Sequence, residues 1–534
     1  MNLKNCITLF LFLASPFYLW AQLNNFSTHL PVVHIHTNGQ EIRDEPKILV
    51  DMGIIWDSEG NLNETSGEYN HYNGKIGIEI RGSSSQMFPK KSFGFETRDE
   101  NGMDIDFPLL GLPEEEDWIL YAPYSDKTLI RNVLTFTLAA QLGHYVPRCR
   151  FVELFINDEY WGVYVLMEKI KRDDNRLDIA TLRPDDTEGE ELTGGYIVKI
   201  DKTTGSGGSG WYSDFQNAAG RTTFYQFEEP ESDEIKEEQS EYIQNYFHNF
   251  ETAIYNKEFD SETGYQQYAD ISTFIDYFIM NELSKNVDGY RLSTFFFKDK
   301  NERINMGPIW DFNLAYGNAN YHEAWEVTGI QALAEIGDDQ WQNPFWWKIL
   351  LSDKNFTKEL RCRWNSLHED VFSTERIMSV VDSLATLLDE PKDRNFQRWP
   401  VLGEYVWPNY FVGDDYASEV TWMKNWLYAR IRAIHLAIPG DCDYEPVEPV
   451  EFAVNTYPNP FNDLFTVQVM ADYNYLMKIE LFSVNGTKMF TKDLTVAKGN
   501  NQIEINTSGM PSGFYIYRVF KGNESVAAGK IIKR

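Results

Sequence analysis

The stretch GYRLSTFFFKDKNERINMGPIWDFN, residues 289–313, contains two apolar runs on either side of the polar segment KDKNER. Apolar runs that flank a polar turn in this way predict an antiparallel hairpin, here centred near Asn301. In that register Asp311 lies opposite a residue near Arg291, and Asp288 lies about three residues farther along, roughly 10 Å at about 3.3 Å per residue. The hairpin is therefore expected to bring two carboxylates to one cation, or to two sides of one substrate.

The segments around this hairpin divide the chain into a strand-rich first part and a more helical second part. Strand-like runs with turn residues come first, and one of them turns at Asn157 and Asp158. A helix with a Ser N-cap candidate and a Gly stop is inserted among them. The strand-like segments are residues 31–94 and 150–170, and the helical segments are residues 125–143, 234–284 and 344–436. A mixed sheet followed by helices predicts an α+β fold.

The N-terminus reads MNLKNCITLFLFLASPFYLWAQ, with a Lys near the start, an apolar run from Ile7 to Trp20 and the small residue Ala21. This order predicts a secretory signal peptide over residues 1–21. No later segment approaches the roughly 18 consecutive apolar residues of a membrane-spanning helix. The mature chain is therefore expected to be secreted or held at the cell surface, without an integral membrane segment.

Charge and cysteine content narrow the possible partners. The chain has 48 Lys and Arg against 81 Asp and Glu, and this formal charge of -33 opposes binding to nucleic acid or anionic lipid. The same acidity favours cations or a basic partner. Without the leader the cysteines are Cys149, Cys362 and Cys442, which are too few for a metal knuckle and allow at most one disulfide.

The composition changes in GDCDYEPVEPVEFAVNTYPNPF, residues 440–461, where a short Pro and Glu run is typical of an extended linker. We place the linker at residues 441–452. Beyond it, short alternating runs separated by Asn-Gly, Gly-Asn and Pro-Ser-Gly turns predict a small β-sandwich over residues 453–534.

The segments YPNPF, SGMPSGFYIYRV and GKIIKR of this tail closely resemble the C-terminal sorting domain of the type IX secretion system. The resemblance implies that the tail is recognised by the type IX secretion machinery and directs export through the periplasm. The alternative is a carbohydrate-binding or stabilising sandwich, which is disfavoured because the tail lacks aromatic residues at regular spacing.

Several long segments before the linker resemble the CotH family of spore-coat-type kinases. They are IEIRGSSSQMFPKKSFGFETRDENG, LLGLPEEEDWILYAPYSDKTLIRN, YWGVYVLMEKIKRDDNRLDI, GGYIVKIDK and WDFNLAYGN. The resemblance implies an atypical protein-kinase-like domain, which we assign to residues 22–440. It also implies ATP and Mg²⁺ or Mn²⁺ as cofactors, with transfer of the ATP γ-phosphate to Ser or Thr of an exported or surface protein.

By this resemblance Asp311 is the metal-binding acid and Asp288 the catalytic acid, which can share the metal. These are the two acids that the hairpin brings together, and a phosphoryl transfer needs an acid for the metal and an acid near the acceptor hydroxyl. Two positions depart from the pattern. Asn313 stands where the family often has a second acid, and Ser293 stands where protein kinases have a metal-binding Asn.

The resemblance also implies cofactor contacts from five basic or acidic residues. Lys90 and Lys91, in FPKKSF, match a Lys pair suited to nucleotide phosphates. Glu168, in LMEKI, matches an acid that pairs with that Lys or holds metal, and Arg81 and Arg131 are candidate phosphate contacts. The alternatives are solvated strand-edge charges for the lysines and structural ion pairs for Glu168 and the arginines.

The sequence contains two further patterns that resemble ligand sites, and it allows one alternative function. His34 and His36 alternate on one strand with the parity of metal ligands, but no third ligand is evident, so we interpret them as strand residues. The Gly and Ser runs at residues 82–85 and 205–210 are interpreted as flexible linkers rather than phosphate loops. The alternative to an exported kinase is a non-catalytic surface or matrix-binding protein that keeps the kinase-like fold.

Overall fold

The structure is a computed structural model that describes residues 25–203, 209–260, 262–442, 453–471, 475–483, 486–497, 499–521 and 524–534. The chain forms two compact units, Met1–Cys442 and Asp443–Arg534. The predicted signal peptide, most of the predicted linker and most of the second Gly and Ser run lie outside the described residues.

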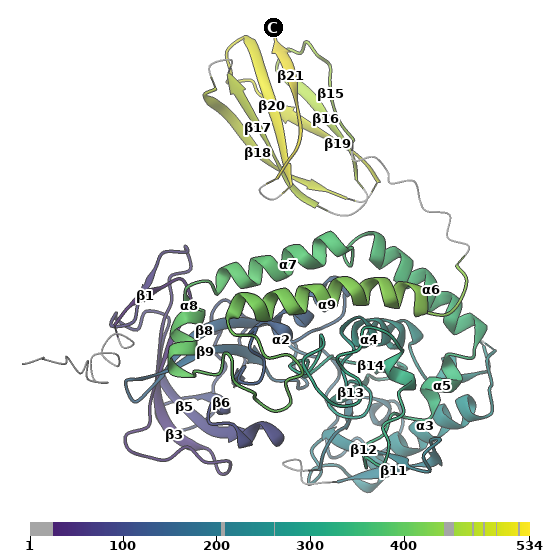
Figure 1. Ribbon diagram of the computed structural model, residues 1–534. Helices are drawn as coiled ribbons and strands as arrows, with labels where there is room; N and C mark the ends of the chain where they lie inside the picture. The colour runs from purple at the N-terminus through teal and green to yellow at the C-terminus, as the bar shows by residue number, and fades with distance from the viewer. Residues whose placement is uncertain are drawn as a thin grey trace, which may run out of the picture. The chain divides into compact units, whose positions relative to one another are not determined.

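The first unit begins with a closed barrel of seven strands in the order β2-β3-β5-β6-β7-β9-β8 (Figure 1). Its neighbours pair antiparallel except β2 and β8, which pair in parallel and close the barrel. The strands are β2 (Val32–His36), β3 (Ile48–Ile55), β5 (Tyr72–Arg81), β6 (Ser92–Arg98), β7 (Asp117–Tyr121), β8 (Cys149–Ile156) and β9 (Glu159–Glu168). Buried Val, Ile, Leu and Phe side chains fill the barrel. The predicted turn at Asn157 and Asp158 joins β8 to β9, and both residues have the positive φ that such turns require.

A second, antiparallel sheet has the strand order β11-β12-β10-β13-β14 and contains the predicted hairpin. Its strands are β10 (Tyr196–Ile200), β11 (Gly210–Gln216), β12 (Thr222–Glu229), β13 (Thr294–Lys298) and β14 (Ile304–Met306). Lys298 pairs with Ile304, which confirms the turn centre at Asn301. The ladder ends at the pair of Phe296 and Met306, so Asp311 follows a loop rather than a paired strand.

Helices supply the rest of the first unit and confirm the α+β class. They are α2 (Arg131–Ala139), α3 (Glu237–Tyr255), α4 (Ile271–Ser284), α5 (Trp346–Leu350), α6 (Lys354–Glu369), α7 (Thr374–Leu387), α8 (Pro391–Arg398) and α9 (Tyr416–Ala437). Helix α4 is buried along almost its whole length, as expected for a helix that is apolar all round. Helices α7 and α9 lie side by side (Figure 1). Among the described residues, none of the helices combines the length and the apolar character that crossing a membrane requires.

Cys362 of α6 and Cys442, which follows α9, form a disulfide with their Cα atoms 5.1 Å apart. Cys149 keeps a free thiol, so the three cysteines of the described residues form one disulfide and leave one thiol over, within the limit set by their number. Disulfides persist mainly in oxidising compartments, so this pairing accords with an exported chain.

The second unit is a β-sandwich of two antiparallel sheets with the strand orders β15-β16-β19 and β18-β17-β20-β21. The strands are β15 (Ala453–Tyr457), β16 (Leu464–Ala471), β17 (Tyr475–Ser483), β18 (Lys488–Val496), β19 (Gly499–Asn506), β20 (Gly513–Lys521) and β21 (Glu524–Lys533). Alternate side chains of both sheets, such as Val467 and Ile479, form one buried core. The alternating runs of the sequence therefore fold as predicted.

Candidate functional site

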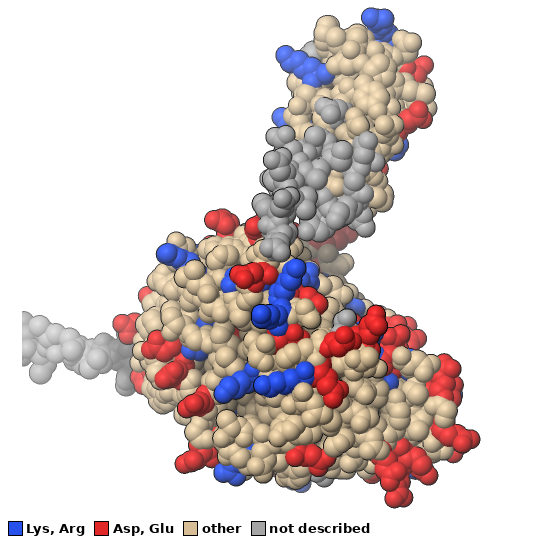
Figure 2. Space-filling view, turned by 90° about the vertical axis from the view of Figure 1, so that its right-hand side faces the viewer, with Lys and Arg blue, Asp and Glu red and all other residues tan. Residues whose placement is uncertain are grey.

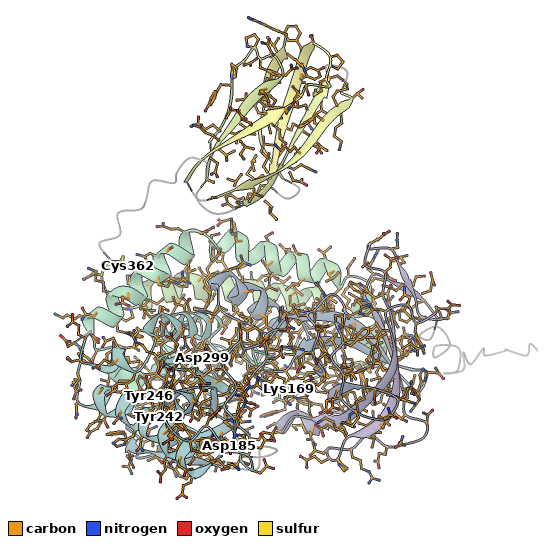
Figure 3. All side chains as sticks on the ribbon, turned by 180° about the vertical axis from the view of Figure 1, so that it is seen from behind. Lys169, Asp185, Tyr242, Tyr246, Asp299 and Cys362 are labelled. Carbon is orange, nitrogen blue, oxygen red and sulfur yellow. A yellow bond between two sulfur atoms is a disulfide. The ribbon has the colours of Figure 1, made fainter. Side chains whose placement is uncertain are left out.

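A cavity of about 1280 Å³ lies between the barrel and the second sheet of the first unit. Its lining is polar and comes from both sides: Glu79, Arg81, Asp117, Tyr121 and Lys169 from the barrel, and Lys199, Asp201, Lys202, Asp288 and Asp311 from or near the second sheet. Figure 3 shows Lys169, which follows β9, between the two groups of strands. Asp288 and Asp311, the two acids predicted from the hairpin, thus share one cavity with Arg81.

Asp311 is held at the cavity by two hydrogen bonds to the peptide group that joins it to Phe312. It has φ +58°, a left-handed conformation that costs a non-glycine residue free energy unless the surroundings impose it. The backbone N–H of Phe312 donates to Asn132 of α2 at 2.7 Å, and the carbonyl of Asp311 accepts from Asn286 at 3.2 Å. Phe312 itself is buried. These contacts fix the direction in which the Asp311 carboxylate enters the cavity.

Asn286 couples the two predicted acids. Its side-chain amide donates to the Asp311 carbonyl, and its side-chain oxygen accepts from the backbone N–H of Asp288 at 3.3 Å. The two loops that carry the acids are therefore joined through one side chain, which the hairpin register alone does not reveal.

Both carboxylate oxygens of Asp288 accept hydrogen bonds. Arg291 donates to Oδ1 at 2.7 Å and the Tyr321 hydroxyl donates to Oδ2 at 3.2 Å. Arg291 also pairs with Asp339 at 2.9 Å. Asp288 is thus an oriented, half-buried carboxylate with neighbours that keep it in one position.

Asp201, which follows β10, is a third carboxylate at this site and was not singled out from the sequence. Strand β10 pairs with β13 so that Ile200 faces Thr294, which brings Asp201 beside Ser293. The Ser293 hydroxyl donates to Asp201 at 3.5 Å. An acid at the end of the strand-like segment GGYIVKIDK was the available signal. Ser293, at the predicted kinase Asn position, therefore contacts an acid of the site.

Ionisation is disfavoured at Asp311 and Asp201. Water in the cavity reaches the Asp311 side chain, but protein surrounds the cavity, and this burial together with Asp288 and Asp201 raises the pKa of Asp311 to about 7. Burial likewise raises the pKa of Asp201. Converging carboxylates of this kind leave the site short of positive charge, which a bound cation would supply.

Two basic side chains face the acids. Arg81 lines the cavity and lies over the Trp310 ring, 5.9 Å from its centroid. Among the residues that the structure describes, no carboxylate forms an ion pair with Arg81. Lys202 donates to the Ser84 hydroxyl at 2.8 Å and also lines the cavity. Sequence reasoning proposed Arg81 and missed Lys202, although Lys202 directly follows the acid at the end of β10.

The segment interpreted as a flexible linker, residues 82–85, lines the same cavity. It continues into a short 3-10 helix, Ser84–Met87, and Lys91 donates to the carbonyl of Gln86 at its end. Hydroxyl groups of this loop therefore lie where a ligand in the cavity would meet them. Lys91 holds the loop and does not itself line the cavity.

The structure places Lys90 elsewhere than the resemblance suggested. Its side chain is 2% exposed and outside the cavity lining, and its ammonium donates to the carbonyl of Val163 at 2.6 Å and to Asn395 of α8 at 2.8 Å. Burial lowers the pKa of Lys90 well below its usual range. The solvated strand-edge alternative does not describe it either, because the side chain joins β9 to α8.

This position predicts that Lys90→Ala destabilises the fold without weakening nucleotide binding. Removing a buried side chain and leaving its acceptors unpaired typically costs about 2–4 kcal/mol. Denaturant unfolding and an ATP titration below the melting transition measure the two effects separately. Lys91→Ala, at a half-buried position, is the control for stability. A tenfold loss of ATP affinity with unchanged stability would instead return Lys90 to the phosphate-binding role.

Glu168 and Arg131 also lie outside the lining. Met167 and Lys169 face the cavity, so Glu168 between them points to the opposite side of β9, where Arg148 donates to it at 2.7 Å. Arg131 is ion-paired with Asp126 and donates to the Ala315 carbonyl at 3.1 Å. Both are buried residues in structural networks, and Arg131 supports the loop that follows Asp311.

The fold and the cavity define a class of protein: an α+β domain with a carboxylate-centred cavity between two sheets, followed by a separate β-sandwich. Residues 78–434 match the family model described as CotH kinase protein, and residues 455–534 match the secretion system C-terminal sorting domain. The chain belongs to the CotH kinase protein family and ends in a type IX secretion sorting domain. Both resemblances stated from the sequence are confirmed.

No curated protein matches the chain. Among solved structures, the chain is similar to the alkylpurine DNA glycosylase AlkC of Pseudomonas fluorescens bound to DNA containing an abasic site analog. The identity is 10%, the match covers 36% of this chain and 56% of that chain, and the TM-score is 0.13. A likeness this low supports no conclusion about fold or function. Figure 2 shows Lys and Arg across the middle of one face of the first unit, with Asp and Glu toward its edges. The formal charge of -33 over the whole chain opposes binding to DNA.

Proposed function

We propose that the chain is an exported, atypical protein-kinase-like enzyme that transfers the γ-phosphate of ATP to Ser or Thr of an exported or surface protein. The observation that carries this proposal is the convergence of Asp201, Asp288 and Asp311 with Arg81 and Lys202 in one cavity. A phosphoryl transfer requires such a set, because the phosphate charge must be neutralised and the acceptor hydroxyl oriented.

The donor set fits Mg²⁺ or Mn²⁺. Asp311 and Asp201 offer carboxylate oxygens, the ligands that hard divalent cations prefer. The imidazole that also lines the cavity, His322, has its Nε2 atom 3.6 Å from the Asp339 carboxylate. A bound cation would neutralise part of the phosphate charge. Asp201 also offsets the missing acid at Asn313, so the local charge that the family pattern requires is supplied from another strand.

The remaining residues have separate roles in the proposed reaction. Arg81 and Lys202 hold phosphate oxygens, and the hydroxyls of residues 83–85 approach the same group. Asp288 accepts a hydrogen bond from the acceptor hydroxyl and takes up its proton. Arg291 and Tyr321 keep Asp288 oriented before the substrate arrives, so that little reorganisation is needed.

Phosphate transfer from radiolabelled ATP tests the proposal. The mature chain is incubated with ATP, with Mg²⁺, Mn²⁺ or a chelator, and with extracts of exported proteins from the same source. We expect label on Ser or Thr, of the chain itself or of an added protein, only when a divalent cation is present. The proposed kinase activity is contradicted if labelling is the same with the chelator as with a divalent cation, or if no label is transferred under any condition.

The second candidate is a non-catalytic surface or matrix-binding protein, and Asn313 favours it because an amide replaces a charged ligand. A thermal-shift titration with ATP and Mg²⁺ discriminates the two. Ligand binding stabilises a nucleotide-binding protein by mass action, by about 2.7 kcal/mol at a hundredfold excess over Kd. A scaffold without a nucleotide site keeps its melting temperature.

Export gives a prediction that is independent of catalysis. We propose that residues 1–21 direct the chain to the periplasm and that the sorting domain then directs it to the surface. Deleting residues 453–534 should therefore retain the chain in the periplasm while the first unit stays folded, because the two units have separate cores. Cell fractionation and protease accessibility measure the location. Fusing residues 453–534 to a periplasmic reporter is the matched control, and normal surface delivery of the truncated chain refutes the role of the tail.

A further inference from the structure

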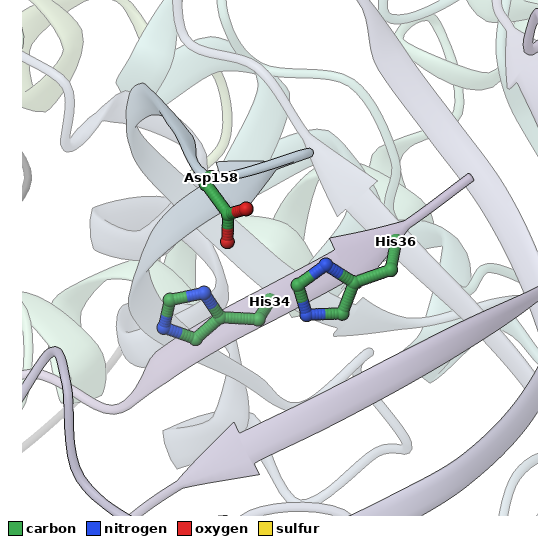
Figure 4. A group of neighbouring side chains, drawn as sticks. All are labelled: His34, His36 and Asp158. Atoms are coloured by element: carbon green, nitrogen blue, oxygen red, sulfur yellow. The ribbon is translucent and has the colours of Figure 1, made fainter. Parts of the chain in front are cut away.

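Two imidazoles and a carboxylate converge on the barrel, outside the cavity lining. His34 and His36 lie on β2 with the same parity, and Asp158 lies in the turn between β8 and β9. One ligand atom from each residue lies within 4.8 Å of the other two. Figure 4 shows the Asp158 carboxylate facing both rings. We propose that His34, His36 and Asp158 bind a divalent transition-metal ion, with zinc as the reference ion.

The fold places Asp158 here by fixing its turn to the end of β2. Strand β8 pairs in parallel with β2, and the N–H of Asn157 donates to the Ile35 carbonyl at 2.9 Å. The Asn157 side chain then accepts from the Thr37 N–H at 2.8 Å and donates to the Thr37 hydroxyl at 2.9 Å. Asp158 is thus the third ligand that the two histidines lack in the sequence, brought from 122 residues beyond His36.

The outer nitrogen of each imidazole already has a partner, which leaves the other nitrogen for a metal. Nε2 of His34 lies 3.0 Å from the Thr65 carbonyl, which can only accept, so Nε2 carries the proton. Nε2 of His36 lies 2.8 Å from the Tyr69 hydroxyl. In Figure 4 the Nδ1 atoms are the ones turned toward Asp158. Metal-binding histidines commonly have their second nitrogen held in this way.

Tyr69 is positioned by a glycine on the neighbouring strand. Gly53 pairs with His34, and a Cβ at Gly53 would lie 2.4 Å from the Tyr69 ring, so only glycine leaves room for that ring. The ring centroid of Tyr69 lies 5.6 Å from that of His34 and 6.3 Å from that of His36. The outer contacts of both imidazoles are therefore part of the barrel packing.

The three ligands are spaced for an ion rather than for direct bonding. Among the described residues, neither a hydrogen bond nor an ion pair joins Asp158 to His34 or His36. In a tetrahedral zinc site with bonds of about 2.0–2.1 Å, the ligand atoms lie about 3.4 Å apart. The three ligand atoms here lie within 4.8 Å of one another, and the exposed Asp158 side chain can move closer to the two imidazoles. By contrast, the cluster of Glu115, Glu116 and Asp117 already holds the Lys171 ammonium at 2.6–2.9 Å.

The chemistry of this set differs from that of the cavity. Imidazole nitrogens with one carboxylate suit Zn²⁺, Ni²⁺, Co²⁺ or Cu²⁺, whereas the carboxylates of the cavity suit Mg²⁺ or Mn²⁺. His34 is buried, His36 is half-buried and Asp158 is exposed, so a bound ion keeps a side open to water. Three protein ligands with an open position are the arrangement of exchangeable or catalytic zinc sites rather than of closed structural ones.

Zinc titration of the full chain tests the site. The protein is stripped of metal with a chelator, desalted, and titrated with Zn²⁺ while saturating Mg²⁺ is present. We expect His36→Ala and Asp158→Asn to lose one equivalent of bound Zn²⁺ or to bind it at least about tenfold more weakly, and Tyr69→Phe to bind it more weakly by about tenfold. Far-UV circular dichroism and thermal unfolding show that each variant is folded.

Three comparisons make the result specific. His248→Ala removes a half-exposed imidazole that lies 2.8 Å from Asp214 without a second imidazole, and should leave zinc binding unchanged. Asp311→Asn should keep the zinc equivalent, because it alters only the cavity. Co²⁺ in place of Zn²⁺ should give visible absorption bands that disappear in His36→Ala. Equal zinc stoichiometry and affinity in the wild type, His36→Ala and Asp158→Asn overturns the proposal, as does an equal loss in His248→Ala.

Discussion

Asp311→Asn should abolish metal-dependent ATP binding and lower phosphate transfer on the order of a hundredfold or more. The amide keeps the size of the side chain and its hydrogen-bonding reach, but it removes the charge that a hard cation requires. Several kcal/mol of stabilisation by a metal correspond to at least a hundredfold in rate. The fold should survive, because the contacts of this loop with Asn132 and Asn286 are made by the backbone of Asp311 and Phe312.

Isothermal titration with ATP and Mn²⁺ and the radiolabel assay measure the two losses. Asp214→Asn, which removes an exposed carboxylate outside the cavity lining, is the matched control and should behave as the wild type. Asn313→Asp, two residues along the same loop, adds the acid that the family often has and should strengthen metal binding. If Asp311→Asn keeps wild-type binding and transfer, the acid is a turn residue and not a ligand.

The parts of the fold that depend on local order in the chain could be predicted from the sequence. The hairpin turn at Asn301, the turn at Asn157 and the sandwich of the tail each follow from apolar runs and turn residues that are neighbours in the sequence. Asp288 and Asp311 belong to this group, because one hairpin joins them. The family resemblance assigned a role to each of these two acids, and both acids line the cavity.

The features that the sequence did not show depend on which face of a strand a residue occupies and on pairing between distant strands. Glu168 belongs to a segment with the right resemblance, but its neighbours Met167 and Lys169 take the cavity side of β9. Asp201 reaches the site only because β10 pairs with β13, a contact across about a hundred residues that no local pattern shows.

The same reasoning explains why His34 and His36 had no visible third ligand. Their own strand was predicted, and so was the turn that contains Asp158. What the sequence could not show is that β2 and β8 pair in parallel and close a barrel, which sets that turn against the end of β2. A site formed at a barrel closure is therefore found from the structure, whereas a site formed by a hairpin is found from the sequence.

Asp288→Asn should leave much of the ATP and metal affinity intact and lower turnover by about 10²–10⁴-fold. The proposed role of Asp288 appears when the acceptor hydroxyl gives up its proton, and general acid–base groups contribute about this much to a rate. An interaction made mainly in the transition state changes kcat more than substrate binding. Arg291 keeps its pair with Asp339, so the substitution does not leave a buried cation alone.

The contrast between the two acids separates the roles within one assay. Asp288 is held through Arg291 and Tyr321, whereas burial, together with the neighbouring carboxylates, raises the pKa of Asp311 to about 7. Substituting a ligand of the cation should therefore chiefly weaken ATP binding. Substituting the oriented acid should chiefly lower turnover. Measuring ATP affinity and single-turnover transfer for both variants decides this. If Asp288→Asn weakens ATP binding as much as Asp311→Asn does, Asp288 is a metal ligand, and the acid that receives the hydroxyl proton has to be sought among the other carboxylates of the cavity, beginning with Asp201.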